Sequence, residues 1–239
     1  MFADEININI ENITPVIPLN IYQFWHSSTI PDSVKESVEN IKNNNPEFNH
    51  FLYNENEARE FIKNNFPEKV LRGYDLLIPY ALKCDLWRYC ILYLNGGIYL
   101  DAKYTCYDNF KLMYLTECEY FCKDIKESGG GIYNAFMICN AKNNVMLRAI
   151  DKVLDNIEND FYGRWSLEPT GPLMLKSFFT DQERENLKLN LFVEHTEIYI
   201  RYNTKNILRF HPNYRKEQQR LTQKHWAYMW VDRNIYVKS

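Results

Sequence analysis

Short apolar runs alternate with amphipathic segments along the first third of the chain. Residues 19–25 and 48–53 are rich in Ile, Leu, Phe and Tyr, of which all but Leu favour β-strands. Each run is followed by a segment whose apolar positions recur with helical spacing. These two apolar stripes consist of Val34, Val38, Ile41, Ala58, Phe61 and Ile62. A repeated succession of strand and helix predicts an α/β fold.

Polar residues mark where these two helices begin. Ser33 and Glu36 have the spacing of a capping box, in which a Ser and a Glu three residues later satisfy each other's backbone N–H groups. Asn54 stands just before the second helical segment, and we predict that it caps that helix.

The alternation continues in the second half of the chain. Residues 119–122 and 132–138 have the composition of further strands, and residues 143–158 form an amphipathic helical pattern. No linker rich in Pro, Gly or Ser divides the 239 residues, so we predict one domain spanning residues 1–239. The expected architecture is α/β, with a mostly parallel central sheet flanked by helices.

Residues 81–95 form a strongly apolar helical segment, yet they contain Asp85 and Arg88. At 3.6 residues per turn these two charges lie on one stripe of the helix. A buried charge is costly unless it meets a partner or a ligand. A simple ion pair between neighbouring turns and a ligand-binding role are therefore both open.

The segment that follows delivers a carboxylate to the edge of a sheet. Gly96-Gly97 ends the helix, and the short apolar run 98–100 is typical of a buried strand. Asp101 comes directly after this run. Because ligands of open α/β sheets bind beyond the carboxyl ends of the strands, Asp101 is a candidate to hold a divalent cation against a diphosphate.

Charge and cysteine content narrow the function classes. A net charge of −3 and the lack of a dense Lys/Arg cluster give no reason to expect nucleic acid as a partner. Of the six cysteines, Cys84 and Cys90 share one helix on different faces and cannot bridge each other, so we expect reduced thiols. The chain begins acidic, without a basic flank and apolar run, which predicts no signal peptide or transmembrane anchor and a cytoplasmic location.

The central block resembles glycosyltransferase family 32, the DXD-motif sugar-transferring proteins related to the yeast initiating α-1,6-mannosyltransferase. The residues that carry the resemblance run from Ala81 through Arg88-Tyr89 and Leu92-Tyr93 to Gly96-Gly97-Ile98-Tyr99-Leu100-Asp101. Weaker likenesses occur in order at 17–25, 45–48 and 225–230. The resemblance implies a GT-A fold and transfer of a hexose from a nucleotide sugar.

One departure from the family pattern concerns the cation. The family has Asp-x-Asp where this chain has Asp101-Ala102-Lys103, which changes the local formal charge by two units. The resemblance implies Mn²⁺ or Mg²⁺, and three outcomes are open. Asp101 and His225 hold the cation, Lys103 itself neutralises the diphosphate, or the site is inactive.

The resemblance also supplies candidate roles. Gln23 and Trp25 would contact the nucleotide base, although Trp25 as a plain core residue is an equal alternative. Asp85 would bind ribose or sugar hydroxyls, and Arg88 the diphosphate or a sugar hydroxyl. The candidate donor-binding residues are Gln23, Trp25, Asp85, Arg88, Tyr99, Asp101 and Trp230, and the candidate catalytic residues are Asp101, Lys103, Arg88 and Glu168.

The family's reactions retain anomeric configuration, so a phosphate oxygen can take the acceptor proton and no side-chain base is required. An inverting route would need a base, and Glu168 or Asp101 would be the first candidates. Thr170 is expected to cap a helix that begins near Pro172.

Three functions remain open from the sequence. The favoured one is a glycosyltransferase that moves a hexose from a UDP-sugar, or from GDP-mannose, to a glycan, a protein-linked sugar or another hydroxyl acceptor. A second is a catalytically impaired sugar-nucleotide-binding protein, and a third is a structural α/β domain in which Asp85 and Arg88 form only an ion pair.

Overall fold

The computed structural model describes residues 13–219 and 225–238. The N-terminal residues on which the expected lack of a signal peptide depends lie outside the described ranges. Within these ranges, none of the helices combines the length and apolarity needed to cross a bilayer. The six cysteines are free thiols and five are buried, as expected from the placement of Cys84 and Cys90 on one helix.

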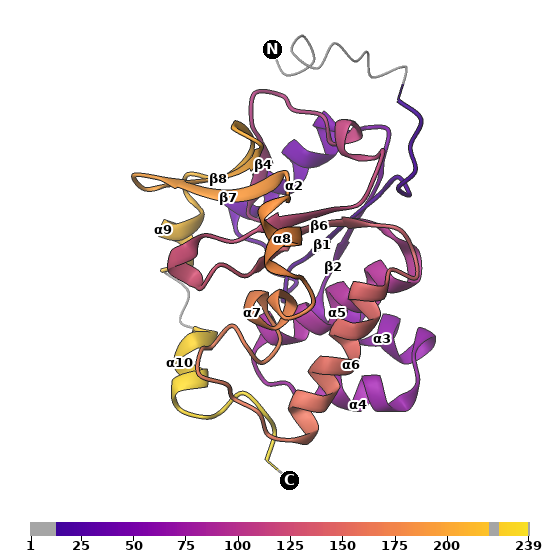
Figure 1. The fold of residues 1–239 in the computed structure, drawn as a ribbon, viewed down its shortest axis with the longest axis vertical. Coiled ribbons are helices and arrows are strands. Elements are labelled where there is room, and N and C mark those ends of the chain that lie inside the picture. The colour runs from indigo at the N-terminus through magenta and orange to yellow at the C-terminus, as the bar shows by residue number, and fades with distance from the viewer. Residues whose placement is uncertain (1–12, 220–224, 239) are drawn as a thin grey trace.

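The described residues form a nine-stranded sheet in the order β2-β1-β3-β6-β5-β7-β8-β9-β4 (Figure 1). The strands are β1 (Asn20–Phe24), β2 (Asn49–Tyr53), β3 (Gly97–Leu100), β4 (Tyr104–Cys106), β5 (Tyr120–Lys123), β6 (Ile132–Cys139), β7 (Leu189–Glu194), β8 (Glu197–Tyr202) and β9 (Lys205–Phe210).

The helices are α2 (Asp32–Asn44), α3 (Glu55–Asn65), α4 (Glu68–Leu76), α5 (Tyr80–Asn95), α6 (Asn144–Glu158), α7 (Pro172–Lys176), α8 (Asp181–Glu185), α9 (Tyr214–Gln218) and α10 (Trp226–Val231). The α/β class and the elements expected in residues 19–158 are confirmed, with boundaries shifted by one or two residues.

The prediction of a mostly parallel sheet is wrong. In the described ranges, β1 pairs in parallel with β2 and β3, and β5 with β7, whereas five other pairings are antiparallel. Two-residue connections join β7 to β8 and β8 to β9, and connections this short allow only antiparallel hairpins. His195 and Asn203 provide the positive φ angles of 54° and 53° in these turns. The sheet is therefore mixed.

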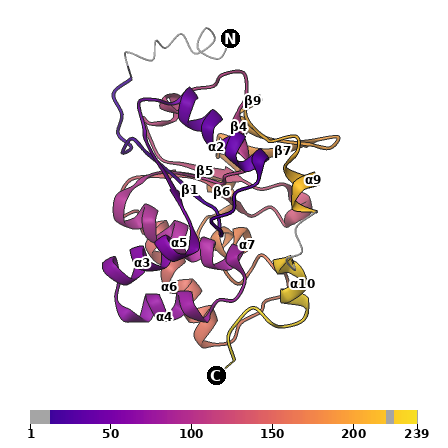
Figure 2. The ribbon, with the colours of Figure 1, turned by 180° about the vertical axis from the view of Figure 1, so that it is seen from behind.

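Helices cover both faces of the sheet (Figures 1 and 2). On one face the core contains side chains of α3, α4, α5 and α6 together with Tyr22, Tyr99 and Met137 from the strands. On the other face Ile21, Ile98 and Phe136 pack with residues of α2 and of the short helix Leu112–Leu115. This alternation follows from the two-residue period of a strand, and it assigns Tyr99 to the α5 side.

Of the two helix caps predicted from the sequence, the one at α3 is confirmed and the one at α2 is wrong. Asn54 forms the expected cap of α3, as part of a capping box with Glu57. The predicted capping box of Ser33 and Glu36 is wrong, because α2 begins after Pro31 and Ser33 lies inside its first turn. The Ser33 hydroxyl instead donates to Glu217 Oε2 at 2.7 Å, which ties α2 to α9.

Two glycines connect α5 to β3. Gly96 and Gly97 have φ angles of +63° and +106°, which L side chains rarely adopt. A Cβ at Gly97 would lie 2.7 Å from the backbone oxygen of Asn20, at the point where β3 comes alongside β1. The sharp turn lets α5 pack on the same sheet that β3 joins, and it sends β3 toward Asp101.

Candidate active site

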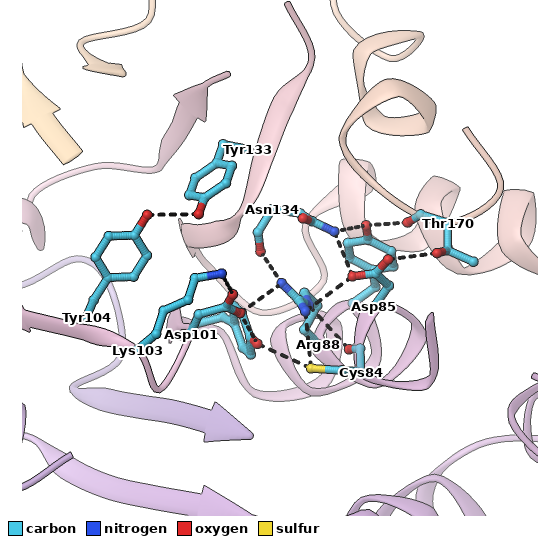
Figure 3. Close-up of polar contacts among 11 residues, drawn as sticks. Cys84, Asp85, Arg88, Asp101, Lys103, Tyr104, Tyr133, Asn134 and Thr170 are labelled. Atoms are coloured by element: carbon cyan, nitrogen blue, oxygen red, sulfur yellow. Dashed lines mark hydrogen bonds and ion pairs between the residues drawn. The ribbon is translucent and has the colours of Figure 1, made fainter. Parts of the chain in front are cut away.

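Two segments of the central block meet around the Arg88 guanidinium (Figure 3). Arg88 lies on α5 between two carboxylates, with Nη2 3.2 Å from Asp85 Oδ1 and Nη1 3.2 Å from Asp101 Oδ1. Asp85 and Arg88 are buried, and Asp101 follows the end of β3 directly. The structure therefore brings together the three charged residues that the sequence singled out at 85, 88 and 101.

The Arg88 guanidinium uses all five of its N–H groups within the protein. Nε donates to the Cys84 carbonyl oxygen, and Nη1 donates to the Asn134 carbonyl oxygen at 2.7 Å and to Asp101. Nη2 faces Cys84 Sγ and Asp85. Since a guanidinium has no further donor, Arg88 holds the two carboxylates in place and has no N–H left for a ligand.

The carboxylate of Asp101 is enclosed by donors on both oxygens. Oδ1 accepts from the Tyr99 hydroxyl at 2.6 Å and from Arg88, while Oδ2 accepts from Lys103 Nζ at 2.5 Å. Burial alone would raise the pKa of Asp101, but the positive charges of Lys103 and Arg88 and these hydrogen bonds lower it below its ordinary value. Asp101 is therefore a carboxylate at neutral pH.

The Lys103 ammonium lies between Asp101 and three aromatic rings. Nζ is 5.9 Å from the ring centroid of Tyr104, 6.0 Å from that of Tyr133 and 5.0 Å from that of Phe210. Burial would lower the pKa of Lys103, but the adjacent Asp101 carboxylate raises it well above its ordinary value. The Lys103 side chain is 19% exposed. The site thus contains a permanently charged cation on a side chain that is not fully buried.

The Asp85 carboxylate receives two further hydrogen bonds that the sequence did not reveal. Thr170 Oγ1 donates to Oδ2 at 2.7 Å, and Asn134 Nδ2 donates to Oδ1 at 2.9 Å (Figure 3). Burial raises the pKa of Asp85 to about 6, although Arg88, Thr170 and Asn134 act in the opposite direction. Asp85 is therefore mostly ionised at neutral pH and becomes neutral in mild acid.

The sequence contains a feature that could have pointed to Asn134 as a buried polar partner. Asn134 interrupts an otherwise apolar strand, and a buried amide requires partners. No pattern in the sequence linked Thr170 to Asp85. The expected role of Thr170 as a helix cap is wrong, because Gly171 is the N-cap of α7. With Pro172 fixing the first helical φ, Thr170 lies one residue before the cap and its hydroxyl is free to reach α5.

Gln23 and Trp25 lie on the α2 side of the sheet, and Trp25 shares a buried cluster with Ala102, the residue between Asp101 and Lys103. Gln23 is fully buried and its Oε1 lies 2.7 Å from His50 Nε2 on β2. Trp25 packs with Val34 and Val38 of α2, and its indole N–H donates to the Thr29 carbonyl oxygen. Both residues therefore belong to the side of the sheet opposite Tyr99, and their contact with a nucleotide base stays a prediction.

The remaining candidates lie in later segments of the chain. Glu168 Oε2 accepts from the backbone N–H of Arg164 at 2.6 Å, and Glu168 lines a hollow of about 590 Å³. Trp230 on α10 donates its indole N–H to the Tyr162 carbonyl oxygen at 2.7 Å. His225 caps α10, where its Nδ1 accepts from the backbone N–H of Ala227, and burial lowers its pKa.

The residues around Asp101 do not fit a divalent cation. Mn²⁺ or Mg²⁺ would need a carboxylate oxygen at about 2.0–2.2 Å, and each oxygen of Asp101 already accepts a hydrogen bond from a charged donor. Position 103 supplies an ammonium where the motif would supply a second acid. Across residues 13–219 and 225–238, no group of three or more His, Cys, Asp or Glu residues is arranged to hold a metal. A cation held by only Asp101 and His225 among the protein's side chains stays a prediction.

Comparisons with known proteins agree with the geometry. Residues 31–120 match the family profile described as a glycosyltransferase sugar-binding region containing a DXD motif. An uncharacterized glycosyltransferase, L373, of Acanthamoeba polyphaga mimivirus is 38% identical over 96 residues, which are 39% of this chain and 38% of that protein. Inositol phosphoceramide mannosyltransferase 3 of Schizosaccharomyces pombe is 34% identical over 96 residues, 40% of this chain and 26% of the relative.

The matched part of the chain thus spans well under half the length of these two relatives. Among solved structures, the PaToxG glycosyltransferase aligns with a TM-score of 0.54 at 17% identity, over 74% of this chain and 73% of the other. This likeness confirms the expected GT-A-like fold.

Proposed function

We propose that the protein transfers a hexose from a nucleoside diphosphate sugar to a hydroxyl acceptor, on the premise that residues 31–120 match the profile of the DXD glycosyltransferase sugar-binding region. The observation that carries the proposal is the group of Asp85, Arg88, Asp101 and Lys103 at the carboxyl end of β3. Charges are rarely buried in such number unless they meet a ligand or have structural partners, and the side chains of Asp101 and Lys103 are each still 19% exposed.

Three of these side chains have proposed roles that follow from their exposure and their hydrogen bonds. Asp85 would accept a hydrogen bond from a sugar or ribose hydroxyl, since its side chain is 13% exposed. Lys103 would stabilise the negative charge that develops on the diphosphate as the glycosidic bond breaks. Arg88 would act as a positioning residue, because its N–H groups are all used by the protein.

We propose a retaining transfer within a single domain. The acceptor oxygen forms a bond to the anomeric carbon as the bond from that carbon to the diphosphate breaks, and a phosphate oxygen takes the acceptor proton. This route needs no side-chain base, and Asp101 would make a poor one because the charges of Lys103 and Arg88 lower its pKa. The hollow beside Glu168 would be on the acceptor side of the site.

A UDP-sugar is the favoured donor and GDP-mannose the alternative, with a glycan or protein-linked sugar as the acceptor. The relative in Schizosaccharomyces pombe is named a mannosyltransferase, which supports testing GDP-mannose alongside the uridine donors.

The decisive experiment measures donor hydrolysis. The protein is incubated with UDP-glucose, UDP-galactose, UDP-N-acetylglucosamine and GDP-mannose, each with Mn²⁺ and with EDTA, and the released nucleotide is quantified. We expect release from one donor, with the α-anomer of the sugar appearing first in NMR spectra. The Asp85→Asn variant should release much less, whereas Lys69→Gln on the exposed surface of α4 serves as the control.

Two outcomes would contradict the proposal. Binding of a donor without release under every condition would favour a sugar-nucleotide-binding protein without turnover. Lack of binding by all four donors would leave the buried charges as a structural feature of the fold.

A further inference from the structure

We infer that Lys103 takes the place of a divalent cation, so that its ammonium group binds the donor diphosphate directly and the site works without a metal. The inference rests on the proposed function and adds to it the chemistry by which the diphosphate is recognised. It depends on three observations that concern the oxygens of Asp101, the charge at position 103 and the surroundings of the ammonium group.

The first observation is that both oxygens of Asp101 already accept hydrogen bonds from charged donors. Lys103 Nζ lies 2.5 Å from Oδ2, and Tyr99 and Arg88 both donate to Oδ1. A cation that bound Oδ2 would lie against the ammonium, and one that bound Oδ1 would lie against the guanidinium. Either position places like charges in contact inside a buried site, where repulsion is only weakly screened.

The second observation concerns net charge. An acidic side chain and a bound divalent cation together carry one positive charge, which is the charge of a lysine ammonium. With Lys103, the group formed by Asp85, Arg88, Asp101 and Lys103 is neutral without any ion. With an acid at this position the same group would carry two negative charges, which a divalent cation would balance. The lysine therefore provides internally the charge that the motif obtains from a metal.

The third observation is that the Lys103 ammonium is held in position by the protein while N–H donors remain for a diphosphate oxygen. An ammonium has three N–H donors, and Asp101 accepts one of them. The rings of Tyr104, Tyr133 and Phe210 lie within 6.0 Å, so the cation is positioned by aromatic faces that leave its remaining donors unclaimed. The exposed fraction of 19% gives a diphosphate oxygen access to them.

The test uses UDP and GDP as probes and measures binding by isothermal titration calorimetry in EDTA and in Mn²⁺. We expect the wild-type protein to bind one of these nucleotides with the same affinity, within about twofold, in both buffers. Electron paramagnetic resonance of Mn²⁺ should show that the protein with nucleotide does not take up the ion. Both readouts are independent of turnover.

Substitutions at position 103 test whether nucleotide affinity depends on the positive charge of Lys103 or only on the size of its side chain. Lys103→Gln should weaken nucleotide binding roughly 10- to 150-fold, the loss expected for a charge-assisted hydrogen bond. Lys103→Asp should bind weakly in EDTA and recover in Mn²⁺, with one Mn²⁺ bound per chain. Lys69→Asp, the same charge change on the exposed surface of α4, is the matched control and should behave as wild type. Circular dichroism identifies any variant that fails to fold.

Three results would overturn the inference. The first is wild-type binding that disappears in EDTA, the second is Mn²⁺ uptake by the wild-type protein, and the third is unchanged affinity in a folded Lys103→Gln variant. Each leaves the proposed function intact if donor hydrolysis is observed. A protein that binds neither nucleotide in either buffer and releases none from any donor would overturn both.

Discussion

The Thr170 hydroxyl donates to the carboxylate of Asp85 at 2.7 Å, although 85 residues separate the two in the sequence. Through this bond the loop before α7 is attached to the first half of α5, beside the Arg88 guanidinium. The position of a candidate hydroxyl-binding carboxylate therefore depends on a loop that no local pattern connects with it.

Thr170→Val removes this hydroxyl and keeps the shape of the side chain. We expect the free energy of unfolding to fall by about 1–3 kcal/mol, because a buried carboxylate oxygen loses one of its donors. Urea denaturation measures the change. Thr170→Ser keeps the hydroxyl and should lose less than Val does. Equal losses for Val and Ser would show that the methyl group, and not the hydrogen bond, matters.

The pKa of Asp85 predicts a pH dependence of stability. The folded state raises the pKa of Asp85 to about 6 from an ordinary value of 3.8, so folded Asp85 takes up its proton before unfolded Asp85 does. As pH falls from 7 toward 4, wild type should gain stability relative to Asp85→Asn, which has no titrating group there. At pH 5 the relative gain should be about 1.4 kcal/mol.

Urea denaturation of both proteins at pH 7 and pH 5 measures this difference. Asp124, whose burial raises its pKa to about 6 as well, is present in both proteins and cancels in the comparison. A relative loss of wild-type stability at pH 5 would contradict the prediction, and donor binding that improves below pH 6 would contradict the hydroxyl-accepting role of Asp85.

We expect Arg88 to stabilise the fold, independently of any role in the reaction. Arg88→Met leaves Asp85 and Asp101 without their shared guanidinium, and breaking a buried ion pair in this way costs about 3–5 kcal/mol. The double variant Arg88→Met with Asp85→Asn removes one of the unpaired charges. It should therefore be more stable than the sum of the two single changes predicts, which a double-mutant cycle of unfolding free energies detects. Additive losses would show that the residues do not interact.

Gly97→Ala tests the turn between α5 and β3. A Cβ there combines a φ of +106° with a contact of 2.7 Å to the Asn20 backbone oxygen, so we expect a loss of at least about 3 kcal/mol. Gly130→Ala is the matched control, because Gly130 has a φ of +63° and no atom within 4 Å of the added Cβ. It should cost about 1–2 kcal/mol. Similar losses in thermal unfolding would exclude the contact with Asn20 as the cause.

Glu168→Gln tests whether the reaction uses a side-chain base. Gln keeps an oxygen for the backbone N–H of Arg164 but removes the carboxylate charge. If a phosphate oxygen takes the acceptor proton, kcat should change less than about threefold, whereas loss of a general base costs about 10²–10⁴-fold. Steady-state transfer assays distinguish these outcomes.

The sequence predicted those features that depend on local pattern. The apolar helix, the two glycines and the strand that ends before Asp101 follow one another directly, so periodicity and turn residues were sufficient to predict them. Asp85 and Arg88 are one helical turn apart, so the ion pair between them needed no long-range information.

Features that depend on distant residues were not predictable in this way. The faces of β1 could not be assigned from its sequence, and pairing of Tyr22 with Tyr99 sends Gln23 and Trp25 to the α2 side. The contact of Asn134 with Asp85 depends on the antiparallel placement of β6 beside β3, which the expected parallel sheet did not include.

The short β3 strand also limits how this region can change in evolution. Tyr99 and Asp101 lie on the same side because side chains alternate, and the Tyr99 hydroxyl reaches Asp101 for that reason. One residue inserted between Tyr99 and Asp101 would place the two side chains on opposite surfaces. Diversification here is therefore confined to amino-acid replacements, and gain or loss of length has to occur in loops elsewhere.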